Sequence, residues 1–149
     1  MPDGTKRSTE HWFLLLVAGG GALCLVAIAL FLEPDSRGYG THEKLGFAPC
    51  LPMKLWGIPC PGCGVTTSVA HAVRGALGQS LRAQPFGLLL FLGALVFVGW
   101  AGYGHLRGRD LGLTLRELRW KRWAIWAALA MLAGWVYKLA IVCGWLDIG

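Results

Sequence analysis

Apolar residues gather in three long runs along this chain, separated by polar stretches. The runs cover residues 11–32, 85–106 and 124–146. A helix needs about 20 apolar residues to cross the hydrocarbon of a bilayer, and each run is long enough. A segment in lipid must also satisfy its own backbone hydrogen bonds, which an isolated strand does not do. The pattern therefore predicts an all-α integral membrane protein with three transmembrane helices, forming one domain over residues 1–149.

The polar stretch between the first two runs is not uniform. Residues 33–41 are rich in turn-forming residues and predict a loop. Residues 47–64 contain four of the seven prolines, which argues against helix there. Residues 65–77 place apolar side chains at helical spacing and predict a short helix, with Thr66 or Thr67 as its cap. This helix is too short to span, so we expect it to lie on the membrane surface or to re-enter among the spans.

The positions of the charged residues are more informative than the net charge. The net charge of +6 suggests a nucleic-acid binder, but the basic residues concentrate in the link 107–123 and before the first run. Lysine and arginine beside spans mark the cytoplasmic side of a membrane. We therefore expect a cytoplasmic N-terminus and link, with the Cys-rich segment 33–84 and the C-terminus outside. This distribution argues against a nucleic-acid partner and makes the lipid bilayer the expected one.

Three cysteines carry the candidate chemistry, and all lie in the expected outer segment. Cys60 and Cys63 belong to a Cys-Pro-Gly-Cys-Gly motif, and Cys50 lies shortly before it. Cys50 bonded to Cys60 or Cys63 would form a structural disulfide, which persists outside the cytoplasm. A catalytic dithiol of Cys60 and Cys63, with Cys50 as resolving partner, is a second possibility. A helix starting after Cys63 would favour its thiolate. The two remaining cysteines, in the spans, are expected to act as small apolar residues: Cys24 and Cys143.

Zinc is a third possibility for the same cysteines. Cys50, Cys60 and Cys63 would supply three thiolate ligands, but a structural zinc needs four. His71 follows Cys63 by eight residues, about 12 Å along a helix axis, which is too far for one ion to reach both from a continuous helix. A metal site is therefore a weaker prediction than a disulfide.

Other polar residues have two interpretations each. Lys138 lies inside the third run, where a charge is expensive in lipid, so it marks a polar cavity or contact unless its side chain reaches the surface. His71 and Arg74 share one face of the expected short helix and suit either an anionic headgroup or plain solvent. Three histidines are expected to stand alone, with no Ser/His/Asp arrangement: His11, His42 and His105.

The Cys-rich segment resembles a known family. A cysteine, a spacer of nine residues, Cys-Pro-x-Cys-Gly-x-Thr, a short helix and a proline before an apolar run are typical of the bacterial membrane proteins grouped as domain-of-unknown-function family twenty-seven fifty-two. The residues that match this order are Cys50, Gly57, Pro59, Cys60, Pro61, Cys63, Gly64, Thr66, Arg74, Gly75 and Pro85. Thr67 and Gln84 depart from it, because the family usually has arginine and asparagine there. The resemblance covers residues 48–100 and implies a bacterial cytoplasmic membrane location, but no activity.

These observations favour a non-enzymatic accessory or scaffold protein. Its outer motif would be locked by a disulfide or an ion. Other membrane proteins would pack on small-residue faces at Gly19–Gly21 and at Ala130 with Gly134. The alternatives are a membrane thiol-disulfide oxidoreductase that uses Cys60 and Cys63, and a zinc-binding membrane protein.

Overall fold

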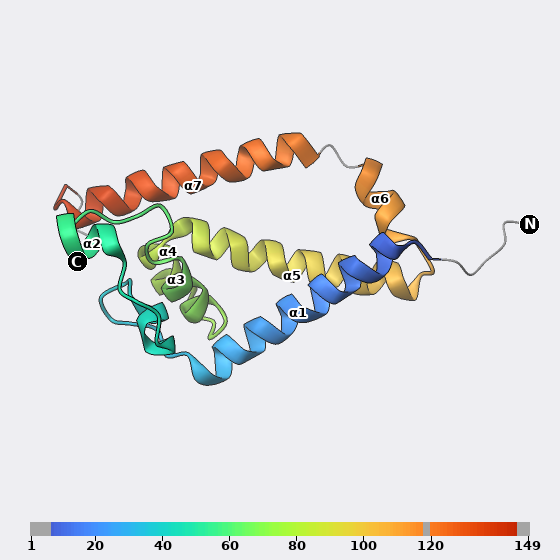
Figure 1. Cartoon of the computed structure of the whole chain (residues 1–149), viewed down its shortest axis with the longest axis horizontal. Coiled ribbons are helices and arrows are strands. Elements are labelled where there is room, and N and C mark those ends of the chain that lie inside the picture. The colour runs from blue at the N-terminus through green and yellow to red at the C-terminus, as the bar shows by residue number, and fades with distance from the viewer. Residues whose placement is uncertain (1–6, 118–119, 146–149) are drawn as a thin grey trace, which may run out of the picture.

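The part of the chain that the structure describes, residues 7–117 and 120–145, contains helices and no strand. In this computed structural model, three helices are long and apolar enough to cross a membrane. They are α1 (Thr9–Phe31), α5 (Pro85–Leu106) and α7 (Trp120–Val142) (Figure 1). The predicted three-span helical membrane fold is confirmed. Residue 146, the predicted end of the third span, and residues 118 and 119 of the basic link lie outside the described residues.

Helix α5 is the central span, and both α1 and α7 contact it (Figure 1). Ala18 of α1 and Ala101 of α5 are buried together, and such small side chains let two helices approach closely in a membrane. Leu111, the first residue of α6 (Leu111–Glu117), completes this cluster. The outer faces of the long helices carry exposed large apolar side chains such as Leu16 and Val96, which suits contact with lipid.

A polar cluster joins the starts of α1 and α6 to the end of α5. The carboxylate of Asp110 accepts hydrogen bonds from the Ser8 amide at 2.7 Å and the Ser8 hydroxyl at 2.8 Å. His11 Nε2 lies 3.1 Å from His105 Nδ1, and the Leu111 amide donates to His11 Nδ1 at 3.1 Å. The expectation that His11 and His105 stand alone was therefore wrong. Because the Ser8 hydroxyl donates to the carboxylate and not to an imidazole, the cluster lacks the key hydrogen bond of a catalytic triad.

The Cys-rich segment folds at the opposite end of the spans (Figure 1). A loop leads into a 3-10 turn, η1 (Thr41–Leu45), and then into α2 (Leu51–Trp56). The prolines had argued against any helix here, and that prediction was wrong for α2. Pro52 lies in the first turn of α2, where the backbone amide has no partner within the helix, so proline is tolerated.

The helix expected over residues 65–77 ends early, at Ala72. It is α3 (Val65–Ala72), and a turn with Gly75 at φ +77° separates it from a helix that was not expected, α4 (Leu77–Ala83). The predicted threonine cap is also absent: α3 begins after Gly64 without a side-chain cap. Thr67 is instead buried, and its hydroxyl lies 2.7 Å from that of Thr41, which ties α3 to η1.

Helices α3 and α4 pack against the start of α5 through one serine. The Ser68 hydroxyl lies 2.8 Å from the Ser80 hydroxyl and 2.8 Å from the Gln84 carbonyl oxygen. A Cβ on Gly87 would come within 2.6 Å of Ser68 Cβ, so only glycine fits there. This contact fixes the turn that bears the cysteines relative to the spans.

Candidate functional site

The three outer cysteines lie close to one another at the turn before α3. Cys50 immediately precedes α2, and the Cys63 amide donates to the Cys60 carbonyl at 2.9 Å within the motif. Cys50 and Cys60 are close enough for each thiol to affect the pKa of the other. Cys63 is buried, with 5% of its surface exposed. Cys60 therefore has Cys50 as well as Cys63 near it, and both pairings considered from the sequence stay predictions.

The surroundings give the three thiols different acidities. Burial raises the pKa of Cys63 to about 11, and the neighbouring Cys60 and Cys50 add to that rise. Burial and the Cys50 thiol also raise the pKa of Cys60. Burial opposes ionisation of Cys50 too, but the Met53 amide and the Cys60 thiol lower its pKa on balance. The prediction that the helix start would favour a Cys63 thiolate was therefore wrong, and Cys50 has the greatest thiolate character.

A cavity of about 250 Å³ opens beside Cys50 and Cys63. The side chains of His42, Lys54 and Glu43 also line it. Although a histidine and two cysteines share this cavity, no three His, Cys, Asp or Glu side chains in the described ranges are grouped closely enough to hold a metal ion. All five cysteines are free thiols. Cys24 and Cys143 are exposed at the spans, away from this cavity.

The turn of residues 59–64, which carries Cys60 and Cys63 and is called the Cys turn below, is held by the spans as well as by its own loop. Trp135 of α7 donates from its indole nitrogen to the Pro59 carbonyl at 2.8 Å. Gly64, at φ +88°, leaves no room for a side chain, since a Cβ there would lie 2.8 Å from the Gly38 carbonyl oxygen and 2.9 Å from that of Ala83. The loop at Gly38, the Cys turn and the end of α4 at Ala83 therefore meet at Gly64.

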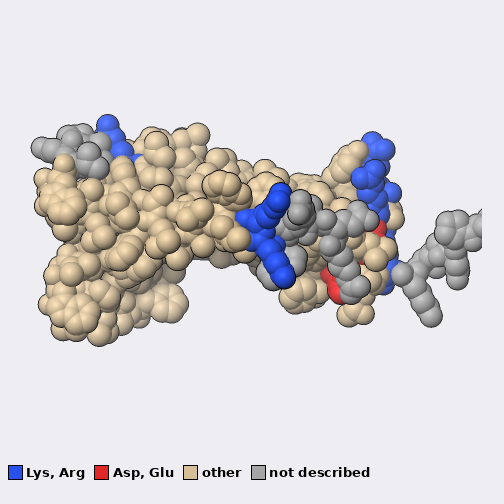
Figure 2. Space-filling view, turned by 90° about the horizontal axis from the view of Figure 1, so that it is seen from above, with Lys and Arg blue, Asp and Glu red and all other residues tan. Residues whose placement is uncertain are grey.

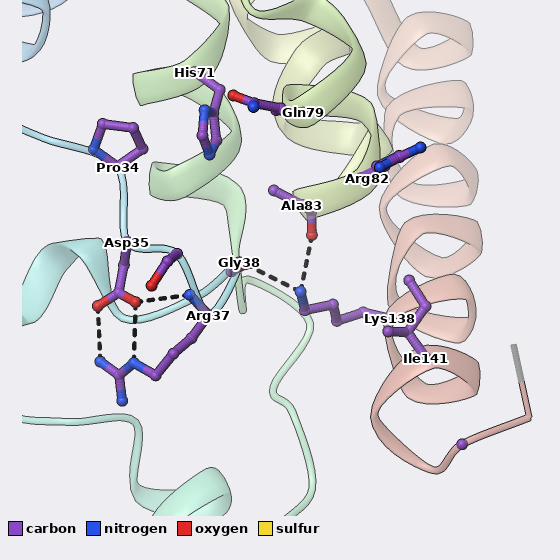
Figure 3. A pocket seen from close by; sticks show the side chains of 12 residues that line it. Pro34, Asp35, Arg37, Gly38, His71, Gln79, Arg82, Ala83, Lys138 and Ile141 are labelled. Carbon is purple, nitrogen blue, oxygen red and sulfur yellow. Dashed lines mark hydrogen bonds and ion pairs between the residues drawn. The ribbon is translucent and has the colours of Figure 1, made fainter. Parts of the chain in front are cut away.

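Lys138 extends from α7 into this junction. Its ammonium donates to the Gly38 carbonyl at 3.0 Å and to the Ala83 carbonyl at 3.1 Å (Figure 3). Only 3% of the residue is exposed, so its side chain does not reach the surface. The ammonium also lies 5.7 Å from the centre of the Tyr39 ring. A lysine in a span is therefore surrounded by the backbone oxygens of the Cys-rich segment.

A second, larger cavity of about 790 Å³ lies on the other side of this junction. His71 of α3, Gln79 and Arg82 of α4, and Lys138 of α7 line it (Figure 3). Burial and the charge of Arg74 lower the pKa of His71. Arg74 itself does not line the cavity, because its guanidinium donates to the Ala70 and Ala29 carbonyls. Sequence reasoning thus found His71 and Lys138 but missed Gln79 and Arg82, whose spacing on α4 was the available signal.

Comparison with known proteins identifies one family. Residues 50–98 match the model of a protein of unknown function (DUF2752), which confirms the resemblance suggested by the motif. The match begins at Cys50 and includes the Cys turn, α3, α4 and the first part of α5. No curated protein and no solved structure matches the chain significantly.

Proposed function

We propose that this chain is a membrane accessory protein whose outer segment is locked against its spans by a disulfide between Cys50 and Cys60. The observation that supports the proposal is the proximity of these two thiols, each of which affects the pKa of the other. Bond formation removes two protons and two electrons, which an oxidising compartment accepts. Closing a loop of this length stabilises a fold by about 3 kcal/mol.

The topology we propose has the basic link in the cytoplasm and the Cys-rich segment outside the bacterial cytoplasmic membrane. Its support is the separation of the two regions, since α6 and the Cys turn lie at opposite ends of the spans (Figure 1). On the face that Figure 2 shows, basic side chains lie in the middle and at the α6 end, and a smaller group lies at the Cys-bearing end. An impermeant maleimide on intact cells should label Ser36→Cys and spare Arg109→Cys. The reverse result would contradict this topology.

Partners would pack on the open glycine face of α1. Cβ atoms added at Gly19, Gly20 or Gly21 would meet nothing within 4 Å, so this face is free in the described structure. The second small-residue face is already used, because Phe86 and Gln84 pack against Gly134. We therefore assign partner binding to the Gly19–Gly21 face alone.

Mass spectrometry of protein that is alkylated before reduction tests the proposed disulfide between Cys50 and Cys60. Wild type purified from cells under acid quench should carry one bridge, between the peptides of Cys50 and Cys60. Cys63→Ser should keep that bridge, while Cys50→Ser or Cys60→Ser should lose it. Three alkylated outer thiols in the wild type, or a bridge that includes Cys63, would refute the assignment.

Thiol-disulfide exchange is a second candidate, favoured by the lowered pKa of Cys50 and the cavity beside it. The Cys50 thiolate would attack a partner disulfide, forming a mixed disulfide and releasing one partner thiolate. Cys60 would then attack the Cys50 sulfur, releasing the second partner thiol and leaving a Cys50–Cys60 bond. Cys60→Ser should trap the mixed disulfide, and Cys50→Ser should not. No trapped species with Cys60→Ser would leave the structural lock as the better assignment.

A further inference from the structure

We propose that the 790 Å³ cavity binds a phosphate-bearing anion through Arg82, His71 and Lys138. The cavity is large enough for a headgroup such as phosphoglycerol, because ligand pockets have volumes of roughly 300–1,000 Å³. Its nitrogen-bearing side chains come from three different helices, α3, α4 and α7 (Figure 3).

The charge of the lining favours an anion. Asp35 is the single carboxylate among the described residues that line the cavity, and Arg37 bonds it with two contacts, Nε to Oδ1 at 3.0 Å and Nη2 to Oδ2 at 2.9 Å. These two charges cancel. Arg82 and Lys138 remain, so the lining carries two uncompensated positive charges before any proton on His71 is counted.

Lys138 supplies the buried charge that lacks a counter-ion. Two of its three N–H groups donate to carbonyls, and no residue that the structure describes accepts a hydrogen bond from the third. The neighbouring Cys63 does not balance the ammonium, because burial raises the pKa of that thiol to about 11 and keeps it neutral. A buried ammonium without an anionic partner is costly, and more so within a span, so an anion in the cavity would relieve that cost.

Arg82 supplies the directional contact. It is exposed at the edge of the cavity, and its guanidinium has no hydrogen bond or ion pair with any residue that the structure describes. A guanidinium matches two phosphate oxygens at once, which makes arginine the usual ligand for this group. His71 and Gln79 add further polar groups to the lining (Figure 3).

Lipid and free phosphate share this chemistry, and the surface nearby suits lipid. Leu77 and Leu81 of α4 are each 50% exposed, and Val136 of α7 is 60% exposed. These apolar side chains belong to the helices that line the cavity, so acyl chains can lie against them while the headgroup enters it.

The test compares full-length protein with two matched variants in nanodiscs. Arg82→Gln removes the cavity arginine, and Arg74→Gln removes an arginine nearby that lies outside the cavity, with the same loss of charge. Native mass spectrometry counts phosphatidylglycerol retained from a mixture with phosphatidylcholine, and calorimetry in phosphatidylcholine nanodiscs measures binding of inorganic phosphate. Both variants keep Lys138, so the junction at Gly38 and Ala83 is left intact.

We expect Arg82→Gln to weaken binding about tenfold or more, and Arg74→Gln to leave it within about twofold. Preference for phosphatidylglycerol identifies a lipid ligand, whereas binding of inorganic phosphate without lipid preference identifies a soluble one. Absence of both, or equal loss in the two variants, overturns the proposal. The site uses none of the cysteines, so Cys50→Ser should bind like wild type, and the failure of this proposal would not affect the disulfide assignment.

Discussion

Replacing Gly64 with alanine tests whether the Cys turn is held by the spans. Gly64 has φ +88°, in the left-handed region, and its α-carbon faces the Gly38 and Ala83 carbonyls. A methyl group there would be strained by the backbone and would also collide with two backbone oxygens. The same two oxygens accept from Lys138, so the collision should disturb the ammonium as well.

The expected cost of Gly64→Ala follows from two independent effects. An alanine in the left-handed region costs about 1–2 kcal/mol relative to its usual conformation. Overpacking against backbone, which cannot rotate away as a flexible side chain does, costs about 1–3 kcal/mol. We therefore expect the free energy of unfolding to fall by about 2–5 kcal/mol. The thiol of Cys63, the adjacent residue, should also become accessible.

Unfolding in mixed micelles by titration with sodium dodecyl sulfate, followed by circular dichroism, measures the loss. Alkylation of the Cys63 peptide, followed by mass spectrometry, measures the accessibility. Gly62→Ala is the control: Gly62 has no positive φ, and a Cβ there meets nothing within 4 Å. It should change stability by less than about 0.5 kcal/mol. Equal stability of the two variants, with equally slow labelling of Cys63, would refute the proposed junction.

Three further predictions concern single polar groups. Thr67→Val removes the buried hydroxyl that contacts Thr41 and should cost about 1–3 kcal/mol, whereas Thr66→Val should cost less than about 0.5 kcal/mol; equal effects in the same titration would contradict this. Hydrogen bonds from the Ser8 amide and hydroxyl lower the pKa of Asp110 to about 2, so its contribution to stability should be complete above about pH 4 and lost as the pH falls through about 2. Unfolding curves of Asp110→Asn should lack that pH-dependent step, and an unchanged step would locate it elsewhere. Gln84 Oε1 is buried without a partner in the described structure, so Gln84→Met should destabilise by less than about 1 kcal/mol; a larger loss would show that the oxygen has a partner.

The spans were predictable from the sequence because each folds from residues that are neighbours in the chain. An apolar run forms a helix in lipid whatever surrounds it, so α5 covers the same residues as the second predicted run. The turn at Gly75 was harder to see, since the apolar spacing continues across it and only a positive φ breaks the helix. The prolines misled for a related reason: proline disrupts the middle of a helix but not its first turn, where Pro52 lies.

The candidate site was predictable only in its residue types. Lys138 and Gly38 are 100 positions apart, and their hydrogen bond depends on how α7 packs against the Cys-rich segment. No local pattern encodes that packing. Similarly, the proximity of Cys50 to Cys60 depends on the placement of α2, which the prolines had concealed. Arg82 escaped notice because α4 was not expected.

The bulk of the protein is distributed unevenly along the axis of its spans. α3 and α4 pack beside α5 at the Cys-bearing end, whereas at the other end α6 is the single short helix described (Figure 1). We propose that both helices enter the leaflet on that side, so that the molecule is a wedge that displaces more area at that end. A bilayer that deforms to fit such a shape stores elastic energy, which curvature in the matching direction releases. Highly curved vesicles should accordingly incorporate this chain with its broad end in the convex leaflet.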